Sequence, residues 1–90
     1  MKMFSVYDSK AEAYMRPFFA EATGQAIRSF SDEVNSGNKD SMVALHPGDF
    51  TLFELAYFND GDGHLEVLEA KKSLGCGLDF VRSNLKAAVL

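Results

Sequence analysis

Apolar and polar residues alternate along two segments of the chain. In residues 3–7, Phe4 and Val6 fall on one side of an extended strand, whereas residues 51–58 carry apolar side chains on both sides. Alternation with period two, rich in aromatic and β-branched residues, is typical of β-strands. We therefore predict strands at 3–7 and 51–58. The second strand is either central in a sheet, or covered by a helix on one face and by a partner on the other.

A loop with two glycines, residues 59–63, follows the second strand. Glycine supplies the positive φ angles that tight hairpin turns require. We therefore predict a returning strand at 64–69, with Leu65 and Val67 facing inward and Glu66 facing outward. Pro17 marks the start or the edge of a strand, because proline cannot donate a hydrogen bond to a sheet. A further short strand is predicted at 18–22.

Residues 24–35 follow a helical period instead. The apolar residues on one side of this segment are Ala26, Ile27, Phe30 and Val34. Such a stripe predicts an amphipathic helix that lies on a sheet, with Phe30 in the core. Thr23 is a candidate N-cap, and the run of Asn and Gly residues after residue 34 ends the helix.

The carboxyl-terminal part is less regular. Residues 73–77 contain two glycines, which indicates either a bulged strand or a loop. A helical stripe then predicts a short helix at 79–88, with Asp79 as its cap; the stripe consists of Leu78, Val81, Leu85 and Val89. We predict one domain, residues 1–90, with an α+β fold: a small antiparallel sheet, one covering helix and a short C-terminal helix.

The chain has 90 residues, of which 47% are hydrophobic and 24% charged. These fractions are typical of a globular domain. A domain of this size buries only roughly 60% of the surface of its unfolded chain, so burial between copies would add useful stability. Together with the two apolar sides of residues 51–58, this predicts a homodimer or a higher cyclic assembly.

The net charge of −4 excludes the dominant basic field that is typical of proteins that bind duplex DNA. The single cysteine, Cys76, cannot form an internal disulfide, which favours a cytosolic protein. No apolar run approaches the roughly 18 residues that a membrane-spanning helix needs, so no membrane association is expected.

Metal binding, cofactor binding and catalysis are not predicted. When Gly63 is aligned with the glycine of a calcium-binding loop, the first ligand position falls on Phe58, which has no oxygen to offer. His46, His64 and Cys76 lack the close spacing of zinc ligands. Cys76 could in principle act as a nucleophile with one of the histidines, but a lone cysteine is more often a small buried side chain.

Basic and aromatic residues occur together in two places. Lys10 and Arg16 flank Tyr14 and follow Tyr7, and the only adjacent basic pair is Lys71–Lys72. Rings that stack on bases beside cations that contact phosphates are typical of single-strand binding. These six residues are therefore candidate nucleic-acid contacts; they are Tyr7, Lys10, Tyr14, Arg16, Lys71 and Lys72. The alternative is that the rings belong to the core and the charges are simply solvated.

Several ordered strings within residues 2–69 carry a family resemblance. They are residues 2–14 (KMFSVYDSKAEAY) with Arg16-Pro17-Phe18, residues 26–32 (AIRSFSD), and residues 46–53 (HPGDFTLF) ahead of Phe58-Asn59-Asp60. Together they resemble the small nonstructural protein of gokushoviruses, which are single-stranded DNA phages of the Microviridae related to the chlamydial microviruses.

The resemblance implies a nonstructural accessory protein of genome replication in the host cytoplasm that binds single-stranded DNA weakly. The negative net charge opposes strong coating of a strand, because neutralisation of phosphates dominates such affinity. The alternative is a small dimeric interaction module that engages phage replication or capsid proteins, or a host polymerase, without contacting DNA. No constellation of residues supports an enzyme.

Overall fold

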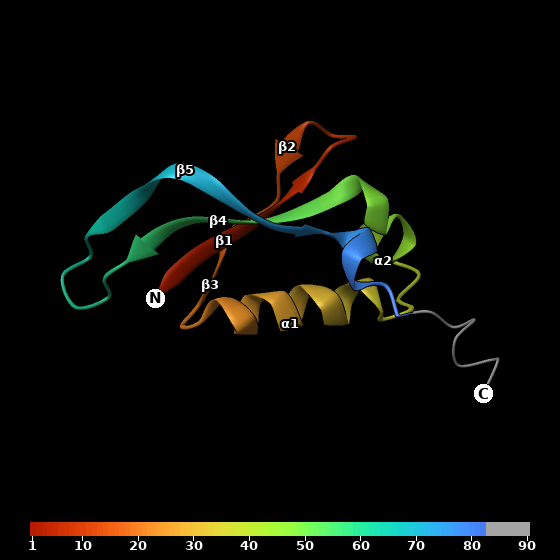
Figure 1. Cartoon of the computed structure of the whole chain (residues 1–90), viewed down its shortest axis with the longest axis horizontal. Coiled ribbons are helices and arrows are strands. Elements are labelled where there is room, and N and C mark those ends of the chain that lie inside the picture. Colours follow the sequence, from red (N-terminus) through yellow and green to blue (C-terminus); the bar gives the residue numbers. More distant parts are fainter. Residues whose placement is uncertain (83–90) are drawn as a thin grey trace.

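The computed structural model describes residues 1–82, which form an antiparallel five-stranded sheet with one main helix (Figure 1). The predicted α+β fold is therefore confirmed. The elements in chain order are β1 (Lys2–Asp8), β2 (Ala13–Tyr14), β3 (Phe18–Ala20), α1 (Thr23–Val34), α2 (Met42–Leu45), the 3-10 helix η1 (Pro47–Asp49), β4 (Phe50–Phe58), β5 (Leu65–Cys76) and the 3-10 helix η2 (Gly77–Phe80).

The sheet is built around β1 and β4. One edge of β1 pairs with β4 along its whole length, and β5 pairs with the other edge of β4. The remaining edge of β1 is shared, because β2 pairs with Tyr7 and Asp8 whereas β3 pairs with residues 2–4. The link between β2 and β3 stays close to β1, since the Met15 amide donates to the Val6 carbonyl over 2.7 Å.

Helix α1 lies across one face of this sheet (Figure 1). Its buried residues pack against alternate residues of β1 and β4 in a single core; the members of this core are Phe4, Val6, Ala26, Phe30, Val34, Val43, Phe50 and Leu52. Phe30 is 3% exposed, which confirms its predicted place in the core. The amphipathic pattern of the helix and the alternation of the strands thus meet in one interface.

A bulge in β4 changes which residues face the helix. Phe4 pairs with Glu54, but its neighbour Met3 pairs with Ala56, so Leu55 is an extra residue on β4. Because neighbours on a strand point to opposite faces, Glu54 and Ala56 lie on opposite faces. Strict alternation along residues 51–58 would place Leu52, Glu54, Ala56 and Phe58 on one face, and the bulge makes this expectation wrong beyond Glu54.

We call the face opposite α1 the open face. Phe53 and Ser73 lie on it as a cross-strand pair, and Tyr7 lies on the same side of β1. Beyond the bulge, the residues on this face are Met3, Phe19, Ala56, Phe58, Leu65 and Val67. The contact between the rings of Phe19 and Phe58, with centroids 5.7 Å apart, supports this placement, because Phe18 points the other way into the core.

The start of α1 differs in detail from the prediction. Ala22 is the N-cap and Thr23 is the first helical residue. The Gln25 side chain accepts hydrogen bonds from the backbone amides of Glu21 and Ala22, which satisfies the donors of the incoming chain. Thr23 therefore does not cap the helix. Its hydroxyl accepts from Lys2 Nζ over 2.7 Å and donates to Glu54 Oε1 over 3.2 Å, joining the helix to the sheet.

Two predicted strands have different lengths. The predicted strand 18–22 ends at Ala20, because the next residues enter α1. The predicted strand 64–69 continues to Cys76 as β5, with one register step between Glu54 and Ala56 and a second between Leu52 and Phe53. Of the glycine-containing segment 73–77, residues 73–76 are therefore a bulged strand and Gly77 begins η2. Gly75 has a φ of 138°, where a side chain would be strained.

The inward placement of Leu65 and Val67 is wrong. The β4–β5 hairpin extends beyond α1 (Figure 1). Leu65 and Val67 lie on the open face and are 44% and 70% exposed. The predicted helix 79–88 is also not observed at its start. Asp79 belongs to η2 and its carboxylate accepts from the Cys76 amide, and Val81 and Arg82 are not helical. Residues 83–90 lie outside the described part.

Candidate nucleic-acid interface

Three aromatic rings and one lysine meet on the open face. Tyr7 and Tyr14 are paired across β1 and β2 with ring centroids 4.9 Å apart, and Tyr14 meets Phe53 of β4 edge-on at 5.8 Å. Lys71 of β5 places its Nζ 5.9 Å from the centroid of Tyr14. Four strands thus contribute one side chain each to what we call the ring cluster: Tyr7, Tyr14, Phe53 and Lys71.

The ring cluster leaves one aromatic ring open to solvent. Tyr14 is 41% exposed, whereas Tyr7 and Phe53 are half-buried and support it. An exposed ring held by its neighbours can stack on a planar group without a large loss of side-chain entropy. The adjacent ammonium group of Lys71 adds positive charge beside that ring, which suits a ligand that combines a flat base with a phosphate.

A tight return between β1 and β2 positions Tyr14. The Asp8 carboxylate accepts hydrogen bonds from the amides of Lys10 and Ala11, at 3.0 and 3.2 Å, as is usual for aspartate in a turn. Glu12 then adopts a φ of 56°. The turn brings Ala13 and Tyr14 back into register with β1, so the two tyrosines become a cross-strand pair.

Two of the predicted basic contacts lie apart from the rings. Lys10 sits in the exposed β1–β2 turn, and Arg16 lies in the exposed link between β2 and β3. Within residues 1–82, neither side chain takes part in an ion pair or a cation–π contact. The structure therefore does not bring either residue into the ring cluster.

The basic pair on β5 is divided between the two faces of the sheet. Lys71 lies over Tyr14 on the open face, but Lys72 is in register with Glu54 on the helix side. The predicted set is therefore brought together only in part: Tyr7, Tyr14 and Lys71 meet, and Lys72 does not join them. Successive residues of a strand point to opposite faces, which explains the separation.

Phe53 belongs to the ring cluster but was not among the predicted contacts. Phe53 follows Leu52 in the predicted strand, so the sequence places the two side chains on opposite faces. Leu52 is buried on the helix side, and Phe53 therefore lies on the open face. The pairing of β2 with β1 brings Tyr14 over the same face, where its ring meets Phe53. Phe19, Leu65 and Val67 were also missed, and they form an exposed apolar patch at the other end of the open face, beside Phe58.

The thiol of Cys76 takes part in local structure. Its Sγ lies 3.8 Å from the carbonyl oxygen of Pro47 and 3.6 Å from that of Gly48, so the thiol joins the end of β5 to η1. Among the residues that the structure describes, no group of three or more His, Cys, Asp or Glu side chains is placed to hold a metal ion.

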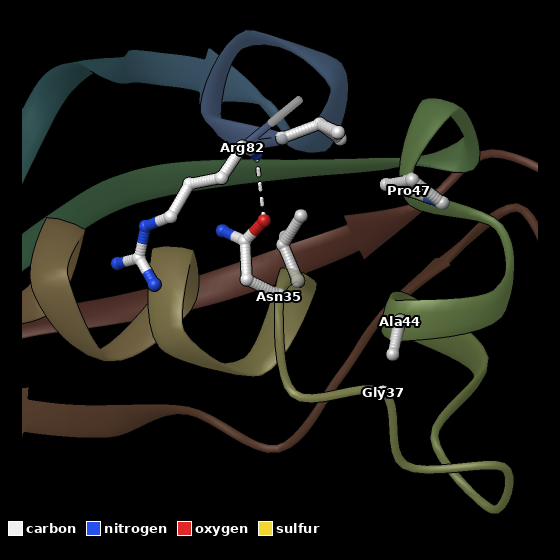
Figure 2. Close-up of a pocket in the computed structure, with 7 residues that line it drawn as sticks. Asn35, Gly37, Ala44, Pro47 and Arg82 are labelled. Carbon is white, nitrogen blue, oxygen red and sulfur yellow. Dashed lines mark hydrogen bonds between the residues drawn. The ribbon is translucent and has the colours of Figure 1, made fainter. Parts of the chain in front are cut away.

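A pocket of ≈ 360 Å³ lies at the end of α1 (Figure 2). Its one side-chain amide, Asn35, is already used: Nδ2 donates to the carbonyl oxygens of Ser31 and Phe80, and Oδ1 accepts from the Arg82 backbone amide. The Arg82 guanidinium meets Asp32 over 3.3 Å. These bonds tie the chain after η2 to the helix, and we assign no ligand to the pocket.

Comparison with known proteins identifies the kind of protein but not its activity. Neither the curated proteins nor the solved structures contain a match to this chain. In residues 1–82, no helix is long and apolar enough to cross a membrane. A family model described as Phage ORF5 protein matches residues 1–80, and the chain therefore belongs to this family of phage proteins.

Proposed function

We propose that the protein binds single-stranded DNA weakly through the ring cluster, as a nonstructural accessory protein of phage genome replication. The observation that supports this proposal is the exposed Tyr14 ring, held between Tyr7 and Phe53 with Lys71 at its side. The family membership supports a phage context. The resemblance to gokushovirus proteins, whose genomes are single-stranded, supports the choice of ligand.

The same geometry indicates why binding should be weak. One exposed ring contributes on the order of 1–3 kcal/mol of stacking per base, and the ring cluster holds a single cation. A net charge of −4 repels phosphates over the rest of the surface. Duplex DNA should bind less well, because its bases are already stacked and cannot reach Tyr14.

The apolar patch favours a second candidate function, a protein-interaction module. Phe19 and Val67 are 46% and 70% exposed, and no lysine or arginine is in register with them on the open face. Exposed apolar patches of this kind more often bind proteins than nucleic acids. The partner in this case would be another phage protein of replication or assembly.

The proposal is tested by fluorescence anisotropy with labelled oligo-dT at low salt. We expect Tyr14→Ala to weaken binding by about 5- to 150-fold, which corresponds to the loss of one stacked base. Lys71→Ala should weaken binding and reduce the slope of log K against log salt by about 0.7, as expected when one phosphate contact to a single strand is lost.

The chain offers a matched control for each change. Tyr57 is also an exposed tyrosine, at 49%, but it pairs with Glu66 and Lys2 on the helix side beyond the bulge. Lys72 is the neighbour of Lys71 on the other face. If Tyr57→Ala and Lys72→Ala weaken binding as much as the changes in the ring cluster, the site is wrong. If the unchanged protein does not bind at low salt, the second candidate is favoured.

A further inference from the structure

Strand β5 presents a long edge to solvent. It has 12 residues, against nine in β4, and it is the last strand of the sheet. In the part of the chain that the structure describes, β5 pairs with no strand other than β4. An edge of this length offers backbone donors and acceptors to which another strand can be added. The pairing of β5 with β4 is irregular at residues 68–71, which stand against Leu55 alone.

The charges along β5 are arranged in two blocks. Glu66 and Glu69 occupy its first half, and Lys71 and Lys72 follow. The only ion pairs within residues 1–82 join Lys2 to Glu54 and Arg82 to Asp32, so none of these four β5 charges has an ion-pair partner there.

This order makes the strand complementary to itself. When two copies run antiparallel, the acidic half of one faces the basic half of the other. A pairing centred on Ala70 puts Glu69 directly opposite Lys71 and Glu66 diagonally across from Lys72. A pairing centred on Glu69 would instead put Glu69 of one copy opposite Glu69 of the other, so the charges select the register centred on Ala70. Opposite charges directly across two strands are stabilising, and like charges are destabilising.

The apolar patch adjoins this edge. Leu65 and Val67 belong to the first half of β5, on the open face, and are 44% and 70% exposed. Antiparallel pairing would place the second half of the partner strand beside them and remove part of their surface from water. Burial of this kind favours association of a small domain.

We propose that β5 is the contact strand of a homodimer, in which it pairs antiparallel with β5 of a second copy about a two-fold axis at Ala70. The axis stands perpendicular to the sheet, so the two sheets become continuous and both open faces lie on the same side. Lys71 belongs both to this edge and to the ring cluster, but the mass of the protein measured without DNA tests the pairing by itself.

The competing explanation is protective. Lysines and bulges on an edge strand hinder pairing with other chains, and β5 carries both. The two explanations differ in what charge reversal does. If the charges only protect the edge, the unchanged protein is a monomer, and reversing one block or both blocks of charge does not produce the proposed dimer. If they match a second copy, reversing one block disrupts the dimer and reversing both blocks rebuilds it.

The experiment measures mass by sedimentation equilibrium over about 1–100 μM, a range in which ordinary dimers dissociate. Four full-length proteins are compared: the unchanged chain, E66K/E69K, K71E/K72E and the variant with all four changes. We expect the unchanged chain to reach twice its mass of 9.9 kDa. Each double variant should have a dissociation constant raised by about tenfold or more, and the quadruple variant should return to the original value.

The change in net charge distinguishes the proposed pairing from a general electrostatic effect on association. Each Glu→Lys change adds two charges, so E66K/E69K moves the chain from −4 to 0. Reduced repulsion alone would make this variant associate more strongly, whereas the proposed pairing requires it to associate less. Circular dichroism checks that every variant is folded. A monomeric unchanged chain, a dimer indifferent to both double changes, or a folded quadruple variant that stays monomeric would each overturn the proposal.

Discussion

Replacing Phe30 by alanine tests the central packing of the domain. Phe30 is 3% exposed, lies between Ala26 and Val34 on the buried side of α1, and meets Phe80 edge-on at a centroid distance of 5.8 Å. Removal of a buried Phe side chain costs about 3–5 kcal/mol. For a 90-residue chain, the whole free energy of unfolding is about 4.5–13.5 kcal/mol, at roughly 0.05–0.15 kcal/mol per residue.

The expected loss is therefore a large share of the total stability. At about 4–8 °C per kcal/mol for a domain of this size, the melting temperature should fall by at least about 12 °C. Thermal unfolding followed by circular dichroism measures this fall, and Met42→Ala is the control, because Met42 is 57% exposed and its loss should cost less than about 0.5 kcal/mol. A Phe30→Ala variant that melts within a few degrees of the parent would refute the packing described for α1.

The edge-on pair makes a second, independent measurement possible. Phe80 belongs to η2, 50 residues further along the chain, and it packs against the core from outside. A double-mutant cycle with Phe30→Ala and Phe80→Ala should give a coupling free energy of about 0.5–1.5 kcal/mol, the usual value for an aromatic pair. Strict additivity of the two losses would show that η2 does not rest on α1.

Two further predictions concern single positions. Glu54→Ala should lower the free energy of unfolding by about 1–3 kcal/mol, because it leaves the partly buried hydroxyl of Thr23 without its acceptor. Urea unfolding at neutral pH measures the loss, and unchanged stability would contradict the hydrogen bond between helix and sheet. Gly77→Ala should lower the free energy of unfolding by about 1–3 kcal/mol or more, because the added Cβ would collide with the backbone of Pro47. Gly24→Ala in α1 is the control: its Cβ would meet no atom within 4 Å, and the change should raise the free energy of unfolding by about 0.5–1 kcal/mol. Equal effects of the two changes on the melting temperature would count against this packing.

Local periodicity was sufficient for the main elements. The helix at 24–35 was predicted within one residue at each end, because its apolar stripe repeats at a spacing that only a helix brings to one side. The β4–β5 hairpin was predicted from two apolar runs around a loop with two glycines. These features depend on residues close together in the sequence, so the sequence alone contains them.

The candidate site was only partly predictable, because it depends on which face each residue occupies. Tyr7, Tyr14 and Lys71 were candidates from composition alone, and their meeting depends on the return of β2 along β1 and on the pairing of β5 with β4. The sequence did not divide Lys71 from Lys72, because the predicted strand ended at residue 69; the two lysines separate because β5 continues to Cys76 and its successive side chains point to opposite faces.

The bulge at Leu55 had the largest effect on the open face. Apolar residues lie on both sides of β4, so the sequence pattern reads the same whether or not one extra residue is present. An extra residue on one strand reverses the direction of every later side chain relative to the neighbouring strand. Pairing with β1 therefore decided that Ala56 and Phe58 join Phe19 on the open face, and that Leu65 and Val67, in register with them, are exposed instead of buried.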